Sequence, residues 1–257
     1  MSIVPFESTF KNNKTDPPEI QLLEIHPRET DDQTEPCVWV FVRREEEYTR
    51  DPTTKAVESA TITVSYQAVN TDARHNTSNR TGGNFQASYD RLANRISLTN
   101  ASPYGSPGAV MVHPALRGRR LGTYVFNIIV GWAKQWPSAD INKITLSQTD
   151  AYPENLERRN QLYEQFGLKF EYADALRNSG SSLPMQPSNL HQVEAWKQNI
   201  TVHNVTEYLG QILIQNHQLQ LDLAARNNTI TDLRARMGEQ ARHPIRTVLE
   251  AYWPWRQ

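Results

Sequence analysis

The sequence predicts a mixed α/β fold: a twisted, mostly antiparallel sheet flanked by helices, followed by one long C-terminal helix. Three observations lead to this prediction. The first hundred or so residues contain short β-branched or alternating runs separated by turn signals, as in an antiparallel meander. Between residues 108 and 172 the order changes to strand, loop, helix, strand, helix, strand. Beyond residue 188, apolar residues recur at spacings of three and four, which indicates a helix.

The composition is that of a globular chain with room for one α/β domain and an appendage. The 257 residues carry a net charge of -1, which gives no general attraction to nucleic acid or to a membrane surface. No run approaches the roughly 18 apolar residues of a membrane span, and no signal peptide is seen, so we expect a cytoplasmic protein. The single cysteine, Cys37, has apolar neighbours that predict a plain buried residue.

The predicted meander follows a polar N-terminal arm, residues 1–18. We expect both faces of its second strand to be buried, because Trp39 and Phe41 alternate with valines. Residues 70–83 are polar and glycine-containing, and they predict a loop. The expected strands are 20–25, 38–42, 61–69, 85–89 and 95–99, the last two forming a hairpin.

The second half of the domain is predicted from helical spacing and end signals. After a strand at 109–112, we expect a helix ending before Pro137, a strand at 144–146, a helix at 155–166 and a strand at 168–172. The first helix has one apolar face, built by Val125, Ile128, Ile129, Trp132 and Trp136. Asn155 can cap the second helix, and Gly167 can take the left-handed position after it.

The loop before the first helix has features of an anion-binding site. Glycines occur at 118 and 122, and arginines at 117, 119 and 120. The first turn of a helix has backbone N–H groups without intrahelical partners, and the helix dipole is positive there. Glycines let such a backbone close on a phosphate, and arginines add forked donors. The alternative is a glycine-containing loop that carries a basic surface patch.

This loop resembles the cofactor motif of the GNAT acetyltransferase superfamily, Arg/Gln-x-x-Gly-x-Gly/Ala. Arg117 fills the first position and Gly122 the last, whereas Arg120 stands where the family usually has its middle glycine. The resemblance implies that acetyl-coenzyme A lies in a gap between two splayed strands, with Met111 and Val112 paired with its pantetheine arm. It also implies that the pyrophosphate is held by Arg117, Gly118, Arg119, Arg120, Leu121, Gly122 and Thr123.

A second segment resembles the downstream helix of the same family, whose pattern is Leu-Tyr-Glu-x-x-Gly-Phe. The matching residues are Leu162, Tyr163, Glu164 and Gly167, with Leu168 in place of Phe. The resemblance implies that Tyr163 is the general acid that protonates the departing thiolate. It also implies a cofactor contact from an asparagine near the helix start, which is either Asn155 or Asn160. The alternative for Tyr163 is a core aromatic, because Leu162 and Phe166 share its apolar face.

The sequence departs from the family on the side of the acceptor. The family usually inserts two helices between its first and second strands, but residues 26–37 are too few and too polar for them. No general base is assigned, since His113 fits a His-Pro turn and residues 45–47 fit a solvated charge run. We expect acetyl-coenzyme A as co-substrate and no metal, and the acceptor amine stays open.

The C-terminal part is predicted to be a linker at 174–188 and a helical segment at 189–257 that ends in an aromatic tail. An Asn216 at an a position would fix the register of a parallel dimer. We therefore expect a homo-oligomer or a protein partner bound through residues 204–237, with packing on the chain's own domain as the alternative. The seam is Val205, Leu209, Ile212, Asn216, Leu219, Leu223, Arg226, Ile230, Leu233 and Met237.

Two functions follow as hypotheses. In the first, residues 19–173 form a GNAT-like domain that transfers acetyl from acetyl-coenzyme A to an amine. In the second, the chain is a structural or assembly protein of a viral or mobile element, in which the GNAT-like fold is a scaffold and the C-terminal helix binds other subunits. Nucleic-acid binding through the arginine loop has no support from the charge balance.

Overall fold

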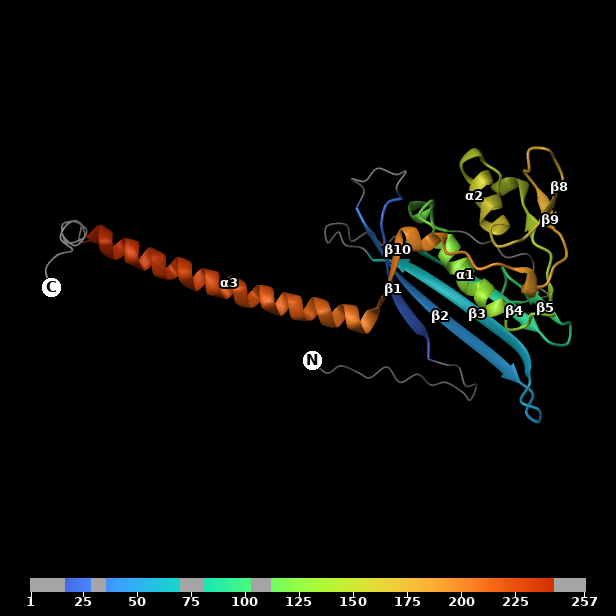
Figure 1. Cartoon of the computed structure of the whole chain (residues 1–257), viewed down its shortest axis with the longest axis horizontal. Coiled ribbons are helices and arrows are strands. Elements are labelled where there is room, and N and C mark those ends of the chain that lie inside the picture. The colour runs from blue at the N-terminus through green and yellow to red at the C-terminus, as the bar shows by residue number, and fades with distance from the viewer. Residues whose placement is uncertain (1–16, 29–35, 70–80, 103–111, 243–257) are drawn as a thin grey trace. The chain divides into compact units, whose positions relative to one another are not determined.

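The computed structural model describes residues 17–28, 36–69, 81–102 and 112–242, and the chain divides into two units at Asn204 and Val205. The first unit is mixed α/β, as predicted, with a seven-stranded, mostly antiparallel sheet and a second, three-stranded sheet. The second unit contains the long helix α3 (Val205–Arg242) (Figure 1). In the part of the chain that the structure describes, no helix combines the length and apolarity needed to span a bilayer.

The large sheet is an antiparallel meander extended at both ends. Its strand order is β10-β1-β2-β3-β4-β5-β6, and only the β5–β6 pair is parallel. The predicted hairpin is confirmed as the antiparallel pair β4–β5. The strands are β1 (Glu19–Ile25), β2 (Val38–Arg50), β3 (Val57–Ala68), β4 (Gly82–Asp90), β5 (Arg95–Ser97), β6 (Asp140–Ile141) and β10 (Ile200–Asn204).

The sheet buries one face. Val40 and Val42 of β2 are buried, but Phe41 between them is 39% exposed, so the prediction that both faces of this strand are buried is wrong. β2 also continues through the charged run to Arg50, although none of its residues after Val42 is buried, because its backbone ladder with β3 extends that far. Ion pairs between alternate residues of this run, such as that of Arg44 with Glu46, place opposite charges on the same face of the strand.

Helix α1 (Leu121–Ala133) packs on β3 and β4 and completes the core. Phe126, Ile129 and Trp132 are buried in this core. The chain leaves the helix ahead of Pro137, and Trp136 of that connection stacks on Tyr89 of β4 with ring centroids 4.3 Å apart. The apolar spacing therefore predicted the buried face of this helix.

The second, small sheet begins a few residues after β6. β5 and β6 pair in parallel through Arg95↔Asp140 and Ile96↔Ile141. A few residues later the chain enters β7 (Thr145–Leu146), which belongs to the small sheet. There β9 (Gly180–Ser182) lies between β7 and β8 (Phe170–Tyr172), and α2 (Pro153–Glu164) connects β7 to β8. β6 and β7 therefore follow each other along the chain but belong to different sheets.

The boundary between the units lies later than the predicted linker. Residues 174–188 contain β9, and residues 189–204 contain β10, which pairs with β1 from Gln21↔Asn204 to Ile25↔Ile200. Serine, glycine and proline are typical of linkers, but they suit short strands and turns within a domain equally well. The long helix accordingly begins at Val205 and not near residue 189. The predicted arm up to residue 16, and the tail 243–257, lie outside the described residues.

Candidate functional site

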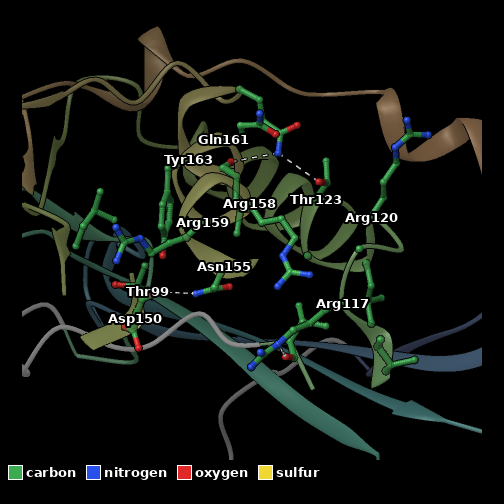
Figure 2. A pocket seen from close by; sticks show the side chains of 18 of the residues that line it. Thr99, Arg117, Arg120, Thr123, Asp150, Asn155, Arg158, Arg159, Gln161 and Tyr163 are labelled. Carbon is green, nitrogen blue, oxygen red and sulfur yellow. Dashed lines mark hydrogen bonds between the residues drawn. The ribbon is translucent and has the colours of Figure 1, made fainter. Parts of the chain in front are cut away.

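A cavity of about 300 Å³ lies at the N-terminus of α1. Four segments wall it: the loop 117–120, the first turn of α1, the strand β7 and the helix α2 (Figure 2). All four belong to the first unit. The sequence predicted ligand binding from the loop and α2 separately, and the fold brings residues of both into the lining of one cavity.

The loop owes its shape to a short 3₁₀ helix, Pro114–Leu116, and to two left-handed residues. His113 caps this helix, since its Nδ1 accepts a hydrogen bond from the Ala115 N–H at 3.3 Å. Gly118 (φ +78°) and Arg120 (φ +60°) then turn the chain into α1. Arg120 stands at the position where the GNAT pattern has a glycine, and it adopts the backbone conformation that glycine tolerates best.

The first turn of α1 faces the cavity. Leu121, Gly122 and Thr123 line it, and the positive end of the helix dipole lies there. A Cβ atom at Gly122 would lie 3.3 Å from Val112 Cγ2 and 3.8 Å from Leu162 Cδ1. The missing side chain at Gly122 therefore keeps this wall of the cavity open.

The cavity is strongly cationic. Arg120 and Arg159 lie on opposite sides of the view in Figure 2, so the positive charge is spread around the cavity. Among the lining residues, Asp150 alone carries a negative charge. Such a surplus favours an anionic ligand. The arginines that line the cavity are Arg28, Arg117, Arg120, Arg158 and Arg159.

These arginines differ in how they are held. Arg117 is anchored, since its Nε donates to the Val112 carbonyl at 3.0 Å and its Nη1 donates to the Tyr152 hydroxyl. Arg159 is anchored by backbone carbonyls, one of them that of Asn178 at 2.9 Å. Arg158 is exposed and makes no hydrogen bond or ion pair with any described residue. Its guanidinium can therefore turn toward a ligand.

The structure separates the two candidate asparagines of α2. Asn155 lines the cavity, and its Nδ2 donates to the Asp150 carbonyl at 2.9 Å. Asn160 is fully buried outside the lining, with its Nδ2 bonded to the Arg177 carbonyl at 3.1 Å. The predicted capping role of Asn155 is wrong, because α2 begins at Pro153 and Tyr152 is its N-cap. Proline in the first turn starts this helix.

Tyr163 is both a core aromatic and a wall of the cavity. Its ring lies edge-on to Phe126, with centroids 5.6 Å apart, and the residue is 6% exposed. Burial raises the pKa of its phenol well above the usual range; Arg159 opposes this rise and Asp150 adds to it. The phenol is therefore protonated at neutral pH, which is the form that a general acid needs, although a raised pKa makes it a weaker one.

Of the remaining predicted site residues, some line the cavity and others do not. Val112 lines the cavity, whereas Met111 lies outside the described residues. Arg119 is not a lining residue, and its carbonyl accepts a hydrogen bond from Asn199 Nδ2 at 3.3 Å. Sequence reasoning missed Arg28 and the pair Arg158–Arg159. The pair is visible on the predicted helix, but Arg28 is far away in sequence and gave no signal.

Comparisons with models of known families, with curated proteins and with solved structures find no match for this chain. The functional argument therefore depends on the chain's own residues.

Proposed function

We propose that this cavity binds acetyl-coenzyme A and that the first unit transfers the acetyl group to an amine, as in the GNAT superfamily that its loop resembles. One observation carries the proposal: the glycine-containing loop and the N-terminus of α1 form one part of the cavity wall, and the strand β7 forms another. A phosphate-tailed, elongated ligand suits both features at once. The loop suits the phosphates, and the strand β7 suits an extended chain.

The phosphate end of the ligand is assigned to the loop side. Backbone N–H groups of the first turn of α1 and the guanidinium of Arg117 supply donors there. Arg158 can add a charge-assisted hydrogen bond from α2, since no described residue occupies its guanidinium. Gly122 allows the ligand to approach the helix backbone closely, because it carries no side chain.

The amide-bearing arm of the ligand is assigned to the strand side. Among the described strands, β7 pairs only with β9, so its other edge keeps unpaired backbone groups. Ile144, Thr145 and Leu146 line the cavity. The amides of a pantetheine arm can pair with it in the manner of an added strand.

In the chemical step, the acceptor nitrogen attacks the thioester carbonyl carbon and the carbon–sulfur bond breaks. Tyr163 gives its phenolic proton to the departing thiolate, and the surplus proton on the nitrogen leaves to water. Tyr163 suits this role because it lines the cavity and is a phenol at neutral pH. Asn155 lines the same side of the cavity and can orient the cofactor arm.

Calorimetry with acetyl-coenzyme A tests the binding. We expect Gly122→Val to weaken binding at least tenfold, because the new side chain would fill the space against Val112 and Leu162. Gly210→Val on α3 is the matched control, since a Cβ atom there meets nothing within 4 Å. Absence of binding to the unaltered chain at millimolar ligand would rule out the proposal.

Turnover tests the role of Tyr163. With an amine-bearing peptide or a polyamine as acceptor, thiol release from acetyl-coenzyme A should proceed in the unaltered chain. Tyr163→Phe should lower the maximal rate at least tenfold while calorimetry shows unchanged cofactor affinity. An unchanged rate would remove Tyr163 from the chemistry without touching the binding proposal.

A second candidate function, assembly through α3, has its own observation. Every described side chain from residue 211 to 242 is exposed, although the helix carries a continuous heptad seam. Leu209, Ile212, Leu219 and Leu223 of this seam are each at least 40% exposed. We propose that α3 self-associates as a coiled coil, with Asn216 fixing its register.

Truncation after Asn204 separates the two candidate functions, because it removes α3 and keeps β10 in the sheet. By analytical ultracentrifugation, the full chain should be oligomeric and the truncated chain monomeric. Retained acetyl-coenzyme A binding in the monomer would support the cofactor site independently of assembly. A full chain that sediments as a monomer at high micromolar concentration would contradict the assembly proposal.

A further inference from the structure

A second group of chemically active side chains lies at the β10–β1–β2 edge of the large sheet, outside the lining of the cavity. β1 and β2 pair through Glu24↔Trp39 and Ile25↔Val38, so His26 and Cys37 come next, opposite each other. Side chains alternate between the faces of a strand. Glu24, His26 and Cys37 therefore share the face opposite to that of the buried residue Ile25. Figure 1 shows β10, β1 and β2 as neighbouring strands.

The neighbouring strand β10 adds a fourth group on the same face. His203 pairs with Leu22 in the β1–β10 register, which places it on the face of Glu24. Its Nε2 lies 3.0 Å from Glu24 Oε2. The other oxygen of the same carboxylate, Oε1, faces His26 and Cys37. Three strands thus converge on one carboxylate.

The two separations measured from Glu24 are close to those of a coordination shell. Glu24 Oε1 lies 3.4 Å from His26 Nε2 and 3.8 Å from Cys37 Sγ, and the three atoms all lie within 4.8 Å of one another. A tetrahedral Zn²⁺ with bonds of about 2.0–2.3 Å separates its ligand atoms by roughly 3.3–3.7 Å. The 3.4 Å separation is longer than an ordinary hydrogen bond between nitrogen and oxygen, which spans about 2.7–3.2 Å.

We propose that Glu24, His26 and Cys37 bind a divalent transition-metal ion of the zinc class, with His203 orienting the carboxylate of Glu24. Thiolate, imidazole and carboxylate are the three ligand types that zinc takes in proteins. His203 holds the non-coordinating oxygen of Glu24, which is the usual arrangement for a residue that orients a metal ligand. The thiol of Cys37 releases its proton to solvent as the ion binds.

The cluster is accessible to an ion from solvent. The His26 side chain is 51% exposed and that of Glu24 is 24% exposed. Cys37 is a free thiol of intermediate exposure, so the expectation of a plain buried cysteine is wrong. Because the residue just after β1 and the residue just before β2 both supply ligands, a bound ion ties those two chain segments together. Binding to the folded state alone then raises stability.

Cobalt titration of the full chain, stripped of metal with a chelator, tests the site. One equivalent of Co²⁺ should produce the absorption band of a cobalt–thiolate bond, and Zn²⁺ should then remove the band because it binds more tightly than Co²⁺. Cys37→Ser should abolish the band, and His26→Asn should weaken Co²⁺ binding at least tenfold. His203→Asn should keep the band and weaken binding 10–100-fold, as expected for a residue that orients a ligand.

His217→Asn is the matched control, because His217 is an exposed imidazole on α3. It should leave both the band and the affinity unchanged. Circular dichroism shows whether each variant keeps its fold, and the melting temperature of the unaltered chain should rise with Zn²⁺. The proposal is overturned by either of two results: no cobalt–thiolate band in the unaltered chain with roughly 100 µM Co²⁺, or Zn²⁺ affinity that survives Cys37→Ser unchanged. Neither result bears on acetyl-coenzyme A, since none of these residues lines the cavity.

Discussion

Helices α1 and α3 have similar sequence patterns and opposite surroundings. α1 has 13 residues, of which nine are buried. α3 has 38 residues, and every described side chain beyond residue 210 is exposed. In both, apolar residues recur at helical spacing. The difference teaches that spacing predicts a helix and its apolar side, whereas the partner of that side comes from the rest of the chain or from another molecule.

The width of the apolar face distinguishes the two helices further. α1 buries a broad face, because Val125, Phe126, Ile129, Val130 and Trp132 all enter the core. The seam of α3 is narrow and has a period of seven residues, which is the pattern of helices that pair with each other. A narrow seam buries too little area against a sheet and suits a second helix better.

The largest effect that this comparison predicts is a loss of stability in α1. Phe126→Ala removes a fully buried ring that contacts Tyr163 and Phe166, and should lower the free energy of unfolding by about 3–5 kcal/mol. Denaturant titration measures it. The matched change on α3 is Leu219→Ala, which should alter unfolding of the first unit by less than about 0.5 kcal/mol and weaken self-association instead. Equal losses of unfolding free energy at both positions would contradict the difference drawn between the two helices.

A smaller effect appears at alkaline pH, because two tyrosines that pack with α1 are buried. Burial raises the pKa values of Tyr124, on α1, and Tyr163, against it. Their phenols stay protonated in the folded chain above pH 10, where the unfolded chain ionises. Stability is therefore complete below about pH 10 and falls above it, by up to about 1.4 kcal/mol per pH unit for each tyrosine.

Urea denaturation between pH 9 and pH 11.5 measures this slope. Tyr163→Phe should make it shallower, because phenylalanine does not ionise in either state. Its stability at pH 7 serves as the reference, so that any loss of packing is separated from the pH dependence. If the single variant keeps the full slope, Tyr163 contributes nothing to it.

The smallest expected effect concerns the start of α1. Arg120 precedes this helix in a left-handed conformation, and its guanidinium donates to Asn199 Oδ1 at 3.3 Å. Arg120→Gly relieves the backbone strain but loses this hydrogen bond and loosens the unfolded chain. We expect a net change between zero and about 1 kcal/mol of stabilisation, measured by thermal unfolding. Arg120→Ala keeps the strain and should be less stable than Arg120→Gly.

The sequence predicted those elements whose residue types and spacing indicate both their secondary structure and their buried face. The helix α1, the hairpin β4–β5 and the left-handed Gly167 (φ +95°) all follow from residue types at fixed spacings. β9 and β10 could not be predicted in this way, because three to five residues of mixed polarity carry no periodic signal. Their pairing with distant strands makes them strands.

For the site, the loop and α2 could be nominated because each carries a local pattern. The choice between Asn155 and Asn160 could not be made, since it depends on which side of α2 faces the cavity. Arg28 escaped for a similar reason: it reaches the cavity from the end of β1. The cluster around Glu24 could not be predicted either, because its members come from three segments that only the strand registers bring together.

The adjacency of β1 and β10 has a consequence for synthesis of the chain. β1 leaves the ribosome early, whereas its neighbour β10 ends at Asn204. One edge of β1 therefore stays unpaired until almost the whole unit has been translated. An unpaired strand edge is a template for pairing with other chains. Slow translation between the two strands should therefore raise the fraction of newly made protein that aggregates, even when the finished unit is stable.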